Sequence, residues 1–290
     1  MLASISDVRV SYGNNNCLKH LDLRIERGIG VMIGPNGVGK STVISVLEGL
    51  TRINGQKNVL VGGVSPYKKP EWSFREVSFL PERPVAAGGR KVRDWIRYYS
   101  MLKPLSLDRL DNLLSRFDVR YVLDENWKNL SSGEMQLVSL ILCLSSESNL
   151  YVLDEPNANI DVSNRLKLAR VLKEMRNERS CSFLITSHLL DEILPVSDYV
   201  IVMSKDNIMG PFYTQKVYTE GSFIVLGTSD PEWVYSKIPT QFKPELMGEE
   251  IILRGVNIMD LINNVDRNLF DFVTSLHIFP YFLRDVLKYE

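Results

Sequence analysis

Cysteine is scarce in this sequence, and long apolar runs are missing. The three thiols, Cys17, Cys143 and Cys181, are too few and too scattered for a disulfide framework or a zinc site. The longest apolar run, at 137–144, is far shorter than the roughly 20 residues of a membrane-crossing helix. The N-terminus lacks the basic start and apolar core of a secretion signal. We therefore expect a cytosolic chain with reduced thiols, whose membrane-crossing partner would be another chain.

An excess of charge of either sign is also absent. The 34 Lys and Arg residues balance 35 Asp and Glu residues, which gives a formal net charge of −1. This balance provides no general attraction to nucleic acid or anionic lipid. The run at 90–99 is locally basic with interleaved aromatic residues, a pattern open to a nucleic-acid surface or to a helix with a buried aromatic side. We favour the helix, with a docking surface for a partner, and expect no nucleic acid.

The residues that are present point first to a nucleotide. Residues 34–41, Gly-Pro-Asn-Gly-Val-Gly-Lys-Ser, fit the phosphate-binding pattern G-x-x-x-x-G-K-[ST]. An apolar run of strand type precedes them, and apolar residues at helical spacing follow. The glycines allow backbone N–H groups to surround a phosphate, and the helix dipole adds its positive end. The predicted ATP-binding residues are Gly34, Pro35, Asn36, Gly37, Val38, Gly39, Lys40, Ser41 and Thr42.

Two roles within this loop follow from P-loop chemistry. Lys40 would reach the β- and γ-phosphates, and the Ser41 hydroxyl would hold Mg²⁺. Further along, the apolar strand at 150–153 runs into Asp154 and Glu155. In a P-loop protein the first acid holds Mg²⁺, directly or through water, and the second orients or deprotonates the attacking water.

Two other side chains are placed near the nucleotide by the predicted strands. His188 follows the strand at 182–186, at the carboxyl end where α/β proteins bind ligands. Tyr12 follows the strand at 3–11, where it would either stack on adenine or be a half-buried tyrosine at a strand end.

The pattern of elements predicts two domains. The first, 1–210, is an α/β nucleotide-binding domain with strands at 21–25, 59–61, 77–80 and 199–203 as well, a polar turn at 14–16, and a helical insertion at about 84–135. The second, 221–290, has predicted strands at 222–226, 241–246, 250–254 and 269–277, and helices at 230–237, 257–268 and 281–287. The order β-α-β-β-α-β is that of a ferredoxin-like module.

Over about residues 3–210, the motifs together resemble the ATP-binding subunit of an ABC transporter. Residues 130–134, Leu-Ser-Ser-Gly-Glu, are similar to the family signature LSGGQ. The resemblance implies that Tyr12 stacks on adenine, Glu155 is the catalytic glutamate and His188 contacts the γ-phosphate. It also implies that two such domains face each other, so that Ser131 and Gly133 bind the ATP held by the partner's P-loop. The fold would be that of a P-loop NTPase of ABC type.

This sequence departs from the family pattern in three places. Glu82 stands at the position of the lid glutamine; it can still ligate Mg²⁺, but an ionised carboxylate donates no hydrogen bond. Ser132 and Glu134 replace Gly and Gln of the signature, and the helix that follows lacks basic residues. These departures bear on the rate of hydrolysis rather than on ATP binding. The metal ligands we predict are Ser41, Asp154 and Glu82.

The C-terminal part resembles the small C-terminal domain of daunorubicin-resistance-type exporter ATPases, with 282–287 at the place of their last short helix. We expect for it a role in packing or dimerisation. For the whole chain we expect an ATPase that binds ATP and Mg²⁺, dimerises with a like or sister chain, and drives a separate transmembrane permease, an exporter, from the inner face of the cell membrane. The catalytic residues would be Lys40, Glu155 and His188. Two alternatives stay open: an ATP-binding regulatory subunit with weak hydrolysis in a heterodimer, and a soluble ABC protein that acts on ribosomes or DNA.

Overall fold

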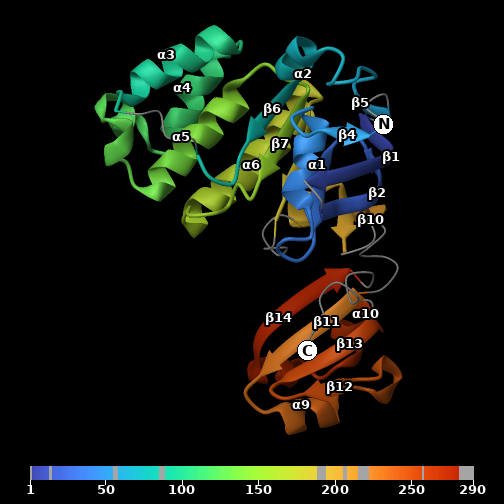
Figure 1. Ribbon diagram of the computed structural model, residues 1–290. Helices are drawn as coiled ribbons and strands as arrows, with labels where there is room; N and C mark the ends of the chain where they lie inside the picture. Colours follow the sequence, from blue (N-terminus) through green and yellow to red (C-terminus); the bar gives the residue numbers. More distant parts are fainter. Residues whose placement is uncertain are drawn as a thin grey trace. The chain divides into compact units, whose positions relative to one another are not determined.

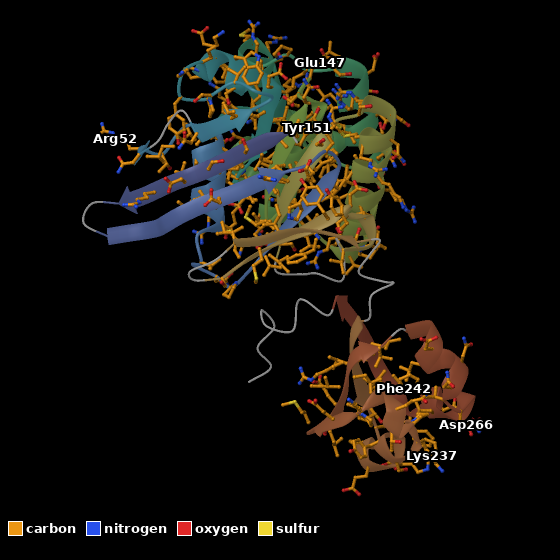
Figure 2. All side chains as sticks on the ribbon, turned by 90° about the vertical axis from the view of Figure 1, so that its right-hand side faces the viewer. Arg52, Glu147, Tyr151, Lys237, Phe242 and Asp266 are labelled. Atoms are coloured by element: carbon orange, nitrogen blue, oxygen red, sulfur yellow. The ribbon has the colours of Figure 1, made fainter. Side chains whose placement is uncertain are left out.

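The computed structural model describes residues 2–12, 15–54, 58–84, 89–187, 194–204, 208–214, 222–256 and 258–280. The chain divides into two compact units, Met1–Pro211 and Phe212–Glu290 (Figure 1). Each unit has an apolar core of its own. Tyr151 is fully buried in the first unit, and Phe242 lies in the core of the second (Figure 2).

A six-stranded sheet positions the site in the first unit, with strand order β10-β9-β3-β8-β7-β6. Its strands are β3 (Ile29–Ile33), β6 (Val77–Leu80), β7 (Leu150–Asp154), β8 (Ser182–Thr186), β9 (Tyr199–Met203) and β10 (Ile208–Tyr213). Strand β3 runs parallel to β8 and β9, and β7 runs parallel to β6 and β8. Every residue of β3, β7, β8 and β9 is buried, because both faces of such a sheet are covered. The carboxyl ends of these parallel strands therefore meet at one edge.

A second, smaller sheet packs over the helix that follows the P-loop. In it, β1 (Ala3–Tyr12) pairs antiparallel with β2 (Asn15–Ile25), β4 (Ile53–Asn54) and β5 (Val59–Val61). The helix α1 (Lys40–Leu47) buries its apolar side in a core formed by residues of both sheets. This double contact holds the P-loop helix on two sides (Figure 1).

The helical region follows the small sheet in the chain. Its members are α2 (Pro70–Glu76), α3 (Val92–Leu102), α4 (Leu107–Arg116), the 3-10 helices η2 (Arg120–Asp124) and η3 (Trp127–Asn129), and α5 (Ser132–Ser145). The helices α3, α4 and α5 lie together at one side of the unit (Figure 1). After β7 the long helix α6 (Val162–Arg179) follows, and the short η4 (Leu194–Val196) precedes β9.

Residues 92–99 of the basic, aromatic run belong to α3, and Lys91 is the N-cap of this helix. Lys91 and Arg93 both pair with Asp124, and the Trp95 ring stacks on Tyr98 with 5.5 Å between ring centroids. Trp95 also contacts Trp127, whose side chain is buried. The run is thus a helix with a packed aromatic side, and two of its cations already have a carboxylate partner.

The described residues of the second unit form a four-stranded antiparallel sheet in the order β12-β13-β11-β14, together with the α-helices α9 and α10. The elements are β11 (Ser222–Thr228), α9 (Pro231–Lys237), η5 (Thr240–Phe242), β12 (Glu245–Met247), β13 (Glu250–Val256), α10 (Ile258–Asn264), η6 (Arg267–Phe272) and β14 (Val273–Pro280). Alternate residues of β11 and β13, including Ile224, Leu226, Ile251 and Leu253, pack against Val234 of α9 and residues of α10.

Several predicted elements need correction. The second strand begins at Asn15 rather than at 21, because pairing with β1 extends through polar residues that the sequence marked as a turn. The strand predicted at 241–246 is confined to β12, since η5 holds Phe242 in the core. Residues 269–272 belong to η6 and not to the last strand, and Leu269 is buried there. The helix predicted at 281–287 lies outside the described residues.

Candidate functional site

The P-loop joins β3 to α1. Gly39 is the N-cap of α1 with φ 109°, a left-handed conformation that strongly favours glycine, and it contributes no side-chain cap. The first turn of α1 contains no acidic residue, so the N–H groups and positive dipole end of the helix remain suited to an anion. The Lys40 ammonium folds back over the loop, where it donates to the carbonyls of Gly34 at 2.7 Å and Pro35 at 3.3 Å.

The Ser41 hydroxyl meets the first acid of β7. Ser41 Oγ donates a hydrogen bond of 3.0 Å to Asp154 Oδ2, although the two residues lie 113 positions apart in the chain. Asp154 is only 6% exposed, so its carboxylate is directed by protein groups rather than by bulk water. An oxygen pair of this kind, a hydroxyl beside a carboxylate, has the chemistry that Mg²⁺ prefers.

Thr186, at the end of β8, organises both acids, and sequence reasoning missed it. The strand register places Thr186 directly beside Asp154. Its hydroxyl donates to Asp154 Oδ1 and accepts the backbone N–H of Glu155 at 3.0 Å. Glu155 has φ 48°, a conformation that costs a non-glycine residue free energy and therefore needs such support. The signal available in the sequence was a hydroxyl residue directly after the apolar residues 183–185, at the carboxyl end of the strand.

These groups line one cavity of about 490 Å³. Its walls bring together the P-loop, Asp154 at the end of β7, Glu155 directly after it, and Glu82, two residues after the end of β6. The lining residues are Asn36, Gly37, Gly39, Lys40, Ser41, Thr42, Glu82, Asp154, Glu155 and Ala158. All three side chains predicted as metal ligands, Ser41, Asp154 and Glu82, thus face the same space.

A metal in this cavity would need ligands beyond the side chains. Over the described ranges, no three Asp, Glu, His or Cys side chains gather closely enough to hold a metal ion. Mg²⁺ in nucleotide sites usually takes one or two carboxylates together with phosphate oxygens and water. The pairing of Ser41 with Asp154 next to a phosphate loop fits that arrangement.

The signature residues line a different cavity of the same chain, of about 430 Å³. Ser131 is the N-cap of α5 and forms a capping box with Glu134: its hydroxyl accepts the Glu134 N–H at 3.3 Å, and its own N–H donates to Glu134 Oε2 at 2.8 Å. The Tyr121 hydroxyl donates to Glu134 Oε1 at 2.6 Å. These bonds, that of Tyr121 first, hold the pKa of Glu134 below its ordinary value. The altered last residue of the signature is therefore an ionised helix cap.

Gly133 is packed tightly in this second cavity. A Cβ added to it would lie 2.7 Å from the carbonyl oxygen of Asn159, so any larger residue forces backbone to move. Ser131 and Gly133 are thus placed on a well-ordered helix start, and neither belongs to the lining of the P-loop cavity.

Two predicted residues have no described side chain. Tyr12 is the last residue of β1 and pairs with Asn15, but nothing is described of its ring. His188 lies outside the described residues, directly after Ser187.

The loop, the cavity and the acids define a P-loop nucleotide-binding protein. Residues 18–158 match the family model described as ABC transporter. The zinc import ATP-binding protein ZnuC of Buchnera aphidicola subsp. Schizaphis graminum (strain Sg) is 29% identical over 217 residues, which cover 70% of this chain and 81% of that protein. The SkfA peptide export ATP-binding protein SkfE of Bacillus subtilis (strain 168) is 28% identical over 228 residues, which cover 73% and 89%. A solved structure described as the ATP binding subunit of an ABC transporter has the same fold, with a TM-score of 0.67, 24% identity, and coverage of 76% and 92%.

Residues 18–158 accordingly form an ABC transporter ATP-binding domain, a type of ATPase domain that is coupled to transport. The predicted resemblance is confirmed at that level. The named relatives are ATP-binding proteins of zinc import and of peptide export, so they do not support the narrower resemblance to daunorubicin-resistance-type exporters. No helix of the described residues is long and apolar enough to cross a membrane.

Proposed function

We propose that the chain hydrolyses MgATP at a site shared between two subunits. The observation that carries this proposal is the bond from Ser41 to Asp154, with Glu155 beside it in the P-loop cavity. Ser41 and Asp154 would hold Mg²⁺, and Lys40 would neutralise the β- and γ-phosphates. Glu155 orients and polarises the attacking water, while Thr186 fixes the positions of both acids.

Three further residues have supporting roles in this proposal. Glu82 lines the cavity and ligates Mg²⁺ or its water, Tyr12 stacks on the adenine, and His188 contacts the γ-phosphate. Each role is carried over from the family resemblance, and only Glu82 is supported by a described side-chain position.

The second half of each site comes from another subunit. Within one chain, Ser131 and Gly133 line a cavity of their own, apart from the P-loop cavity. The family resemblance implies that two chains meet head to tail, with the start of α1 of one chain and the start of α5 of the other on opposite sides of one nucleotide. This supports a dimer in which the signature of each subunit closes the P-loop site of the other.

A groove of about 730 Å³ supports docking of the permease. Its apolar lining includes Leu50, Phe74 and Leu102, whose exposed fractions are 76%, 49% and 53%. Exposed apolar residues gathered in one groove mark an interaction surface. We infer that an apolar segment of the permease occupies it, because the resemblance to ABC transporter ATP-binding subunits implies a separate membrane chain.

We propose that the second unit has a ferredoxin-like fold, which the succession β11-α9-β12-β13-α10-β14 supports.

We propose that transport is outward, which the peptide exporter among the relatives supports. Uptake of the cargo into inverted membrane vesicles that contain the permease would support export, and ATP-dependent loss of cargo from them would support import.

The catalytic assignment is tested with Glu155→Gln. This change keeps the size of the side chain but removes the carboxylate, and general-base loss typically lowers the rate 10²–10⁴-fold. We expect steady-state turnover of MgATP to fall by at least about 100-fold while ATP binding persists. Turnover equal to that of the unchanged chain would overturn the assignment. Lys40→Ala, which removes a phosphate contact, serves as the control that loses ATP binding.

A further inference from the structure

A lysine is buried outside the nucleotide cavity, at the floor of the groove. Lys103, the C-cap of α3, is 1% exposed, although lysine is almost never fully buried. Its ammonium donates to the carbonyl of Phe74 at 2.7 Å and to that of Val77 at 2.5 Å, and it lies 5.0 Å from the centroid of the Phe74 ring. A buried ammonium is costly unless its donors are satisfied, so these backbone bonds must be kept.

The two carbonyls that accept from Lys103 lie in α2 and at the first residue of β6. Phe74 belongs to α2 and Val77 begins β6, so the ammonium holds α3 to the start of this strand. Strand β6 ends only two residues before Glu82, which lines the nucleotide cavity. The four residues of β6 thus connect the bonded carbonyl of Val77 to the segment that contains Glu82.

The P-loop helix ends at the same groove. Glu48 is the C-cap of α1 and lines the groove together with Lys103. Among the described residues no carboxylate lies within 4.0 Å of the ammonium, so Glu48 acts on it through space. The groups that face Lys103 are Glu48 from α1, Glu76 from α2 and Cys143 from α5, with Tyr99 one turn before it in α3.

The groups around Lys103 change the pKa of its ammonium in opposite directions. Burial lowers the pKa of Lys103 to about 8, because water no longer solvates the ammonium, while the carboxylates of Glu48 and Glu76 raise it again. The charged form therefore dominates at neutral pH and is lost as the pH rises through about 8. Burial raises the pKa of Glu48 to about 7, so Glu48 is mostly ionised near pH 8, and removing its charge must move the loss of the Lys103 proton to lower pH.

We propose that Lys103 is a positioning residue for ATP hydrolysis, whose ammonium fixes the start of β6 against α3 and so sets Glu82 in the nucleotide cavity, with Glu48 as its counter-charge. The proposal rests on the function proposed above for Glu82. According to this proposal, β6 connects the groove to the ATP site. The Lys103 ammonium, which takes no part in the hydrolysis itself, maintains that connection.

The first test replaces Lys103 by Met, which is of similar length and uncharged. We expect kcat for MgATP to fall by about fivefold or more with KM within about twofold, as for residues that couple sites without touching the ligand. Backbone hydrogen exchange of 77–82 should become faster. Glu71→Gln is the matched control, since Glu71 lies on the same groove but does not face Lys103, and it should leave both measurements unchanged.

The second test is the pH profile of kcat with Glu48→Gln. We expect its alkaline loss of activity to move at least about half a pH unit lower than in the unchanged chain, because a nearby opposite charge favours the ammonium. In Lys103→Met the loss near pH 8 should disappear. Where Lys103→Met does not fold, the Glu48→Gln profile decides.

Three results would overturn the proposal: full kcat in Lys103→Met, a parallel loss of kcat, ATP binding and melting temperature in that variant, or an unmoved alkaline limb in Glu48→Gln. Failure of the proposed function is recognised separately. If Glu155→Gln retains turnover, the proposed catalytic site is wrong whatever Lys103 does.

Discussion

The hydroxyl of Thr186 provides a sharp test of how the site is built. Thr186→Val keeps the shape of the side chain and removes the hydroxyl that bonds to Asp154 and to the Glu155 N–H. A hydrogen bond to a charged group contributes about 1.5–3 kcal/mol, and a buried N–H left without that partner costs about 1–3 kcal/mol. Since the two effects overlap, we expect the free energy of unfolding to fall by about 2–4 kcal/mol.

The same substitution should reduce catalysis. The Glu155 backbone is held at φ 48° partly by the Thr186 hydroxyl, so its carboxylate moves when that bond is lost. Displacement by about 1 Å can lower a rate about 100-fold, and we expect a fall in kcat of about 10- to 100-fold. Thr186→Ser is the matched control: it keeps the hydroxyl and loses one buried methyl, at about 1 kcal/mol.

The assays are urea unfolding without nucleotide and ATP turnover at saturating MgATP. If Thr186→Val turns over ATP within twofold of Thr186→Ser, the hydroxyl does not position Glu155, and our account of the site is wrong on that point.

The remaining predictions concern the two surfaces beyond the P-loop cavity. Ser131→Asp keeps an N-cap residue on α5 but adds a negative charge, so we expect it to abolish ATP-dependent dimerisation, measured by sedimentation. Ser131→Asn is an equally good N-cap without the charge and should still dimerise. Equal dimerisation of the two variants would exclude contact between phosphate and this helix. Leu50→Glu puts a charge in the apolar groove; we expect loss of co-purification with the permease at unchanged ATP turnover, and retention of the permease would place its docking site elsewhere. Glu71→Gln, at the rim of that groove, is the control for this experiment.

The parts of the fold and site that the sequence predicted are those with local signals. Residues 34–41 specify a P-loop by their sequence motif alone. The apolar strand before Asp154 and Glu155 predicts that these acids lie at its carboxyl end. Because parallel strands end at one edge, their meeting with Glu82 in one cavity also follows from the pattern. The capping box of Ser131 with Glu134 carries a sequence signature as well, S-x-x-E.

What the sequence did not reveal depends on contacts between distant residues. Thr186 acquires its role only when β8 pairs beside β7, and the Lys103 ammonium reaches the carbonyl of Val77, 26 positions earlier, only in the folded chain. Strand β10 was missed because Gly210 and Pro211 normally interrupt strands, whereas an edge position tolerates them. The start of β2 at Asn15 is likewise imposed by pairing with β1, against the local preference of asparagine for turns.

The central claim, a site shared by two subunits, can be tested by mixing two inactive variants. Lys40→Ala disables the P-loop and Ser131→Asp the signature, and each alone should give no turnover. In a mixed dimer one site has both defects and the other has neither, so random pairing predicts recovery of about a quarter of the unchanged rate. An equimolar mixture that stays as inactive as its components would contradict the shared site.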